Sequence, residues 1–181
     1  MVCKITSTNR RGRTRGWTLV EMLLASGVGS LVLIAVLSLT FYSSRSFVAL
    51  SNYADLETTS RLALDAMSRE IRQANGLTSF STTSLVFNDY DNTPLTYTYS
   101  PDAKRLTRTK NGSTVTLLKQ CETLSFGVYQ RNPTNDYNVV ATTNAALCKL
   151  IQLSWKCSRS ILNSNINTES VQSAKIVIRK Q

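Results

Sequence analysis

Glu21 is the residue whose type and position point most directly to chemistry. From Trp17 to Ser44 it is the one charged side chain, in a segment that is otherwise apolar, small or hydroxyl-bearing. A carboxylate in such a segment is costly in lipid unless it meets a partner, so an intramembrane acid indicates a functional site. The alternative interpretation is that Glu21 lies at a membrane interface and is solvated there.

The other residues that could do chemistry form no catalytic set. The chain has no histidine, which excludes histidine-based triads and histidine-containing zinc sites. Asp89 and Asp91 could supply oxygen ligands for calcium, but no downstream glutamate completes an EF-hand loop, so a solvated turn is the favoured interpretation. We therefore expect no enzymatic activity, no metal site and no cofactor.

A cationic segment raises the question of nucleic-acid binding. Exposed cations beside aromatic rings can hold single-stranded nucleic acid. On an alternating hairpin such residues more often form a soluble outer face, and this interpretation is favoured. The residues concerned are Tyr97, Tyr99, Lys104, Arg105, Arg108 and Lys110.

The segment that carries Glu21 is long enough to cross a membrane as a helix. Met22 to Ser44 comprises 23 residues without a charge, and at about 1.5 Å each they span roughly 34 Å, against a hydrocarbon core of about 30 Å. Beyond Arg45 apolar residues recur at helical spacing, so one helix is predicted from about Thr18 to Asn75, ending at a left-handed glycine cap, Gly76. Its amphipathic part is expected to present an apolar stripe of Phe47, Leu50, Ala54, Ala63, Met67, Ile71 and Ala74.

After Gly76 the hydrophobic period changes to two, and turn signals such as Asn111-Gly112 separate short runs of β-branched and aromatic residues. The sequence predicts an α+β fold in which the long helix packs on a small antiparallel β-sheet head. Long polar loops are expected at 131–144 and 158–173. The predicted strands are Ser84 to Asn88, Leu95 to Tyr99, Arg105 to Thr109, Thr114 to Leu118, Thr123 to Gln130, Lys149 to Lys156 and Ala174 to Arg179.

Three of the four cysteines lie in the predicted head, and Cys3 lies near the N-terminus. Cys148 and Cys157 bracket one predicted strand and are too far apart to bridge if that strand is extended. If segments 121–130 and 148–157 pair in antiparallel fashion, Cys121 faces Cys157, which makes a disulfide between these two the preferred pairing. Three buried free thiols are the alternative.

A basic cluster precedes the apolar segment. The chain has 21 Lys and Arg against 11 Asp and Glu, and five of the cations lie before Gly16 with no acid among them. By the positive-inside rule this cluster keeps the N-terminus in the cytoplasm and sends the residues after Arg45 outward. A secretory signal peptide is the main competitor. It fits less well, because the apolar run is too long, Glu21 interrupts its start and no small-x-small cleavage site closes it.

The junction between the basic and apolar segments reads Gly16-Trp17-Thr18-Leu19-Val20-Glu21. It resembles the class III signal of type IV prepilins and of the pseudopilins of type II secretion systems, with Trp17 where the family usually has Phe. The resemblance implies that a prepilin peptidase cuts after Gly16 and methylates the amino group of Trp17. It also implies that Glu21 pairs with the N-terminal ammonium of a neighbouring subunit, since opposite charges attract strongly in a low-dielectric layer.

A second resemblance covers the end of the helix and the first hairpins. The string from Arg61 to Ala74, followed by Tyr99-Ser100-Pro101-Asp102 and by Arg105 to Arg108, looks like J-type minor pseudopilins and W-type minor pilins. It implies a minor structural subunit of a type II secretion pseudopilus or a type IV pilus. The implied partners are other pilins or pseudopilins, the prepilin peptidase and the inner membrane. A ligand-binding minor pilin for adhesion or DNA uptake, and an unprocessed single-pass surface protein, are the alternatives.

Four segments follow from these expectations. Residues 1–16 would be a cytoplasmic leader peptide, 17–44 a transmembrane helix, 45–76 its amphipathic continuation and 77–181 a β-rich head. We expect a single-pass protein of the bacterial inner membrane with a cytoplasmic N-terminus and a periplasmic head, able to enter a filament.

Overall fold

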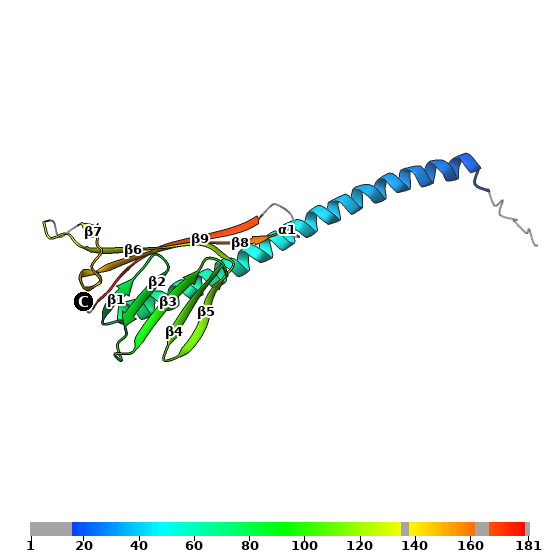
Figure 1. Cartoon of the computed structure of the whole chain (residues 1–181). Helices are drawn as coiled ribbons and strands as arrows, with labels where there is room; N and C mark the ends of the chain where they lie inside the picture. The colour runs from blue at the N-terminus through cyan, green and yellow to red at the C-terminus, as the bar shows by residue number, and fades with distance from the viewer. Residues whose placement is uncertain (1–15, 135–137, 162–166, 180–181) are drawn as a thin grey trace, which may run out of the picture. The chain divides into compact units, whose positions relative to one another are not determined.

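The fold is α+β, as the sequence predicts. A computed structural model describes residues 16–134, 138–161 and 167–179. In this part of the chain one long helix, α1 (Leu19–Gln73), precedes nine strands and a short 3-10 helix, η1 (Ala145–Leu147) (Figure 1). Except for Gly16, the predicted leader lies outside the described residues, and so does Cys3.

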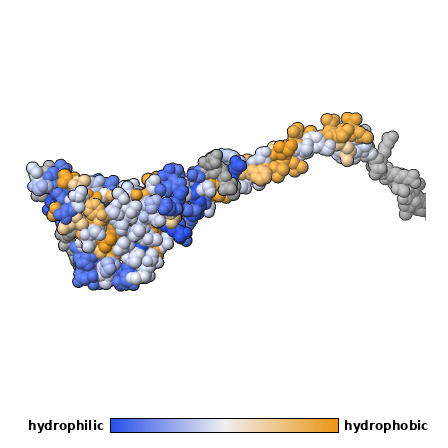
Figure 2. All heavy atoms as spheres, viewed as in Figure 1, coloured by the Kyte–Doolittle hydropathy of each residue, from blue (hydrophilic) through white to orange (hydrophobic). Residues whose placement is uncertain are grey.

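The chain divides into two compact units, the residues up to Ser44 and Arg45–Gln181. We call the second of these the head unit. In the first unit the large apolar side chains of α1 are exposed along the whole helix, from Leu19 to Tyr42, and they appear as a run of hydrophobic residues in Figure 2. Among the described residues α1 is the one helix long and apolar enough to cross a membrane. A single membrane-spanning segment near the N-terminus is compatible with this surface.

The head unit contains two antiparallel sheets. The first has five strands in chain order: β1 (Gly76–Phe80), β2 (Ser84–Asn88), β3 (Pro94–Ser100), β4 (Arg105–Lys110) and β5 (Ser113–Lys119). The second has four strands in the order β7-β6-β8-β9: β7 (Val139–Ala141), β6 (Cys121–Arg131), β8 (Leu150–Ser160) and β9 (Asn167–Val177). Gln120 alone separates β5 from β6, so the chain passes directly from one sheet to the other.

One face of α1 closes the core of the head unit. Its buried side chains recur in steps of three and four from Leu56 to Ile71, and the apolar ones join the same cluster as residues of both sheets, including Phe87 and Trp155. The predicted stripe is confirmed at Ala63, Met67, Ile71 and Ala74.

The earlier part of the predicted stripe is wrong. Phe47 and Leu50 are 69% and 66% exposed, and Ala54 is also exposed. At about 100° per residue these three positions lie on the opposite side of the helix from Leu56 and Met67. The apolar spacing changes phase within the helix, and only the later phase faces the strands.

Several predicted boundaries also change. Gly76 is the first residue of β1 and not a left-handed cap, because the chain enters the sheet at once: the N–H of Asn75 donates to the Asn88 carbonyl at 2.8 Å. Among the described glycines only Gly112 has a positive φ, 74°, and with Asn111 at 51° it forms the predicted two-residue turn between β4 and β5.

Parts of both predicted loops are strands. β7 falls within 131–144, and the end of β8 and most of β9 fall within 158–173. β9 pairs with β8 from Val177 opposite Leu150 to Asn167 opposite Ser160. Backbone hydrogen bonding to a long neighbour therefore holds a polar segment that lacks the apolar alternation of a typical strand.

Candidate functional site

The predicted assembly residue, Glu21, forms a capping box at the start of α1. The backbone N–H and the hydroxyl of Thr18 donate to Glu21 Oε2 at 3.4 Å, and the Glu21 N–H donates to Thr18 Oγ1 at 3.3 Å. In this arrangement the two side chains satisfy backbone donors that the first turn of a helix leaves free. The Thr-x-x-Glu spacing could have been read from the sequence as a helix start.

The two residues of the predicted cleavage site precede this cap. Trp17 is 69% exposed. Among the described atoms, none lies within 4 Å of a Cβ added at Gly16, and Gly16 does not have a positive φ. The described part of the fold therefore gives no steric reason for glycine at position 16.

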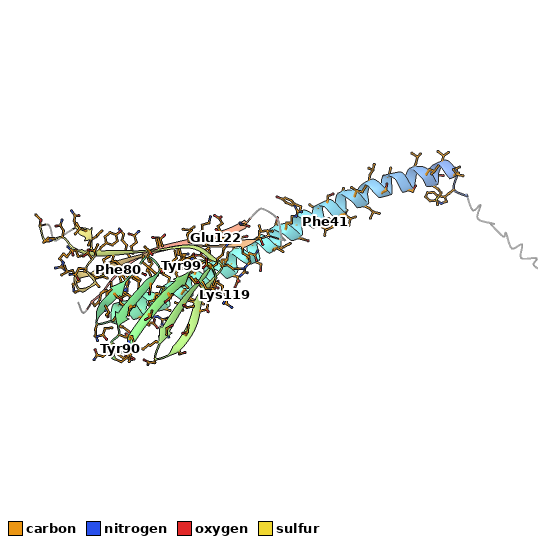
Figure 3. All side chains as sticks on the ribbon, viewed as in Figure 1. Phe41, Phe80, Tyr90, Tyr99, Lys119 and Glu122 are labelled. Atoms are coloured by element: carbon orange, nitrogen blue, oxygen red, sulfur yellow. The ribbon has the colours of Figure 1, made fainter. Side chains whose placement is uncertain are left out.

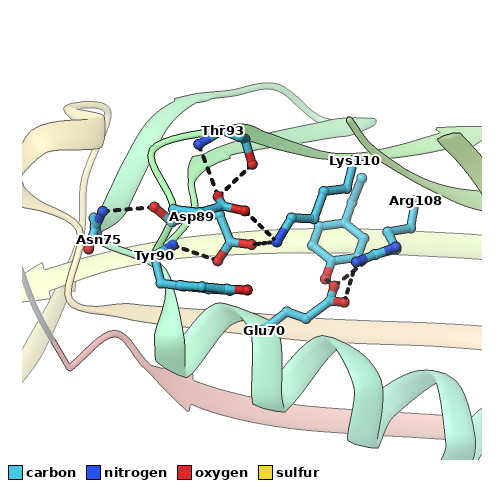
Figure 4. Close-up of polar contacts among 9 residues, drawn as sticks. Glu70, Asn75, Asp89, Tyr90, Thr93, Arg108 and Lys110 are labelled. Atoms are coloured by element: carbon cyan, nitrogen blue, oxygen red, sulfur yellow. Dashed lines mark hydrogen bonds and ion pairs between the residues drawn. The ribbon is translucent and has the colours of Figure 1, made fainter. Parts of the chain in front are cut away.

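A partly buried ionic cluster joins α1 to the first sheet, and sequence reasoning missed it. Arg108 Nε donates to Glu70 Oε2 at 3.0 Å and its Nη2 lies 2.7 Å from Glu70 Oε1, while the Tyr97 hydroxyl donates to the same carboxylate (Figure 4). Burial, reinforced by this bond to Glu70, raises the pKa of Tyr97 far above its ordinary range. The sequence did contain a signal for this contact: by helical spacing Glu70 lies on the same side as Met67 and Ala74, which indicates a charge that faces the core and needs a partner.

A second ionic cluster replaces the solvated turn predicted at Asp89 and Asp91. Asp89 is only 2% exposed. Its carboxylate accepts from Lys110 Nζ, which also lies 3.2 Å from Asp91 Oδ2 and 4.6 Å from the centre of the Tyr90 ring. The solvated-turn prediction is therefore wrong for Asp89, since a lysine on β4 reaches the turn between β2 and β3 and neutralises it. No group of three or more potential metal ligands occurs among the described residues.

Asp91 is held in its charged form. Hydrogen bonds from Thr93, with a smaller contribution from Lys110, lower the pKa of Asp91 to about 2 from an ordinary value of 3.8. A carboxyl group with a depressed pKa stabilises the fold above its ordinary pKa, and this contribution is lost as the pH falls towards 2. The bond to Asp89 raises the pKa of Lys110, which likewise favours its charged state.

The two ionic clusters contain two of the four cations in the segment considered above for nucleic-acid binding. Arg108 and Lys110 are held in ion pairs, and Tyr97 and Tyr99 are 0% and 6% exposed. The two tyrosine rings are therefore not available to stack with bases. Lys104 and Arg105 remain on the surface.

The sequence matches no family model, and no curated protein or solved structure is significantly similar to it. The roles predicted for Gly16, Trp17 and Glu21 therefore stay predictions that rest on these residues and their setting in the chain.

The cysteine register is confirmed. β6 and β8 are antiparallel, and Cys121 lies opposite Cys157. The Cys121 N–H donates to the Lys104 carbonyl at 3.0 Å, so the two cysteines do not exchange both of their backbone hydrogen bonds. Side chains of such non-hydrogen-bonded pairs approach closely, at Cα separations that suit a disulfide. The three described cysteines are buried and unbridged in this structure.

The three thiols lie in different environments. Hydrogen bonding between Cys121 and Cys157 raises the pKa of Cys121 and lowers that of Cys157. Burial raises the pKa of Cys148 to about 11. Cys157 is thus the thiol that most readily gives a thiolate, and it lies beside the one partner to which it can bond.

We expect the head unit, exported to an oxidising compartment, to contain one disulfide between Cys121 and Cys157. Closing this loop should stabilise the fold by about 3 to 4 kcal/mol by restricting the unfolded chain. Peptide mapping without reduction should link these two residues and leave Cys148 to be alkylated after denaturation. A peptide that links Cys121 to Cys148 would contradict the observed register. Alkylation of all three thiols without reduction would show that no disulfide forms.

Proposed function

We propose that this protein is a minor pilin-like structural subunit of a type II secretion pseudopilus or a type IV pilus, processed by a prepilin peptidase and not itself an enzyme. The observation that carries the proposal is the order of its N-terminal features. A basic segment, Gly16 and the apolar Trp17 come directly before a helix that carries Glu21 in its first turn and whose apolar side chains are exposed throughout the first unit. Such a surface requires lipid or other apolar helices around it.

The proposal gives the two parts of the chain different tasks. The exposed first part of α1 would anchor the precursor in the inner membrane and later pack among the helices of other pilin-like subunits. The head unit would face outward, with its own core and its own section of α1. Processing would remove five N-terminal cations and leave a free ammonium on Trp17 as the partner for Glu21 of a neighbouring subunit.

Glu21 could serve to cap the helix or to pair with the ammonium of a neighbouring subunit, and a pair of variants separates these two roles. Glu21→Val removes both the helix cap and the charge, whereas Glu21→Gln removes the charge but keeps a side-chain oxygen that can serve in a capping box. If Glu21 pairs with an ammonium, both variants should insert into the membrane at least as well as the wild type, because a costly carboxylate is gone. Both should nevertheless cross-link to other pilin-like subunits several-fold less.

The measurement is cross-linking yield at equal membrane levels. Loss of cross-linking in Glu21→Val alone would show that the cap is what matters and that the charge has no role in assembly. Undiminished cross-linking in both variants would show that Glu21 is not an assembly contact.

A further inference from the structure

Four cations line one groove of the head unit. Two adjoining hollows share Lys119 and Arg159, and Lys104 and Arg105 complete the wall of one of them. We call these four residues the basic groove. Backbone bonding brings its parts together, because the Lys104 carbonyl accepts the N–H of Cys121 at 3.0 Å. The turn between β3 and β4 is thereby held beside the link between β5 and β6.

Arg105 and Lys119 face each other without an acid between them. They are opposite residues in the β4–β5 ladder, and both are exposed. Like charges directly opposite in a sheet repel each other and destabilise the pairing. In the described part of the chain neither forms an ion pair, although Asp102 also lines the groove. An anion bound between the two side chains would turn this repulsion into attraction.

Arg159 lies at the other side of the groove, where neighbouring side chains hold it in position. Its Nη1 lies 2.8 Å from Asp55 Oδ2, and its Nε donates to Gln120 Oε1 at 2.8 Å. Asp55 neutralises part of its charge, and Lys104 is only loosely paired, at 3.9 Å from Glu122. The two unpaired cations, Arg105 and Lys119, therefore dominate the field of the groove.

The groove lies at the end of the head unit near Arg45, the first residue after the apolar run. Asp55 follows Arg45 by ten residues of α1, or about 15 Å along the helix. Asn52 is closer still and donates to the Ser160 carbonyl at the end of β8. Figure 3 places Lys119 and Tyr90 at opposite ends of the first sheet, so the basic groove and the Asp89–Lys110 cluster are well separated.

We propose that the basic groove binds the phosphate of an anionic phospholipid headgroup while the chain is anchored in the membrane. This inference rests on the anchor of the proposed function. A headgroup layer of roughly 5 to 8 Å covers the hydrocarbon on each side. Long cationic side chains can extend their charged ends several ångströms from the backbone towards such a layer.

A lipid phosphate fits better than the other anions that could enter. It is fixed at a surface to which the chain itself is tied, so its local concentration is high, whereas a free anion in solution has no such advantage. Cations near an anionic leaflet add about fivefold each to the binding constant. A carboxylate of a neighbouring subunit would instead require a protein contact and would depend on the density of protein in the membrane.

The test uses the full chain in vesicles of phosphatidylcholine alone or of phosphatidylcholine and phosphatidylglycerol in equal parts. Flotation first reports whether the anchor inserts in both. Acetylation of lysine side chains, followed by mass spectrometry, then reports how accessible the groove is. We expect Lys104 and Lys119 to react about fivefold more slowly in the anionic vesicles. Lys175 is exposed on β9 and lies opposite Gln152, four residues or about 13 Å along the strands from Lys156. It should react equally in both kinds of vesicle and is the internal control.

Variants and added salt sharpen this test. Arg105→Gln leaves both reporter lysines in place and should abolish most of their protection, whereas Lys175→Gln should leave it unchanged. Both sites are exposed, so the fold should tolerate the changes. Protection should also decrease with salt, because an electrostatic contact at the surface is screened.

Every other outcome contradicts the proposal, and each one identifies which part of it is wrong. Normal flotation with equal acetylation in both vesicles would reject the groove as a lipid site and leave the anchor intact. Failure to float would reject the anchor and the lipid site together. Protection by inorganic phosphate in phosphatidylcholine vesicles would indicate a free-anion site. Protection that rises with protein density in these same vesicles would assign the groove to an acid of a second subunit.

Discussion

In cells that contain a prepilin peptidase, Gly16→Glu should leave the chain uncleaved in the membrane, whereas the wild-type protein should begin at a methylated Trp17. The physical reason is steric. Glycine, the residue before the cut, has no side chain, and a peptidase site shaped to accept glycine has no room for the side chain of glutamate. Intact-mass analysis reads the result directly, because retention of residues 1–16 adds their full mass.

Gly16→Ala is the matched control for this experiment. A Cβ at this position meets none of the described atoms within 4 Å and the backbone is not in the left-handed region, so neither substitution should disturb the described fold. Alanine should be cleaved slowly and glutamate not at all. Normal maturation of Gly16→Glu would show that the predicted processing site is wrong, and unprocessed wild-type protein would favour the alternative of a permanently anchored surface protein.

Met67→Ala should cost the head unit about 2 to 5 kcal/mol of unfolding free energy, the usual range for emptying a fully buried site. Met67 is 0% exposed and lies on the face of α1 that meets both sheets. Urea unfolding of a chain that begins near Ser46 provides the measurement. Weaker attachment of α1 to the sheets should also reduce the fraction of full-length protein that survives proteolysis.

Leu62→Ala provides the control for this change in the same helix. Leu62 is 65% exposed, so its truncation should change the unfolding free energy by only about 0.5 kcal/mol. Equal losses in the two variants would contradict the packing of α1 on the strands. A large loss in Leu62→Ala alone would mean that the opposite face of the helix is the buried one.

Local pattern determined most of the helix and the first sheet. The uncharged run from Met22 and the spacing of Ala63 and Met67 predicted one helix from about Thr18 to Asn75, and α1 ends within two residues of this range. Alternation and the Asn111-Gly112 turn predicted β2 to β5 to within a residue or two. These features are encoded by neighbours in sequence, because side-chain period and turn chemistry act over a few residues.

Tertiary structure decided the elements that have no such local signal. Most of β9 is polar, and it is a strand because β8 offers a ladder along its whole length. The phase of the apolar stripe at Phe47 and Leu50 pointed to the wrong face, since spacing alone does not say where the strands lie. The register of Cys121 opposite Cys157 could be stated only on the condition that their two strands pair.

The charged residues show this division most clearly. Glu21 could be singled out from the sequence as a candidate assembly residue because its whole surroundings, an uncharged helix after a basic segment, are contiguous in the chain. The pairs Glu70 with Arg108 and Asp89 with Lys110 join residues that are 38 and 21 positions apart, and each partner alone reads as an ordinary surface charge. Whether a charge is solvated or buried against its opposite depends on which faces meet in three dimensions, and that is a property of the folded chain and not of any local segment.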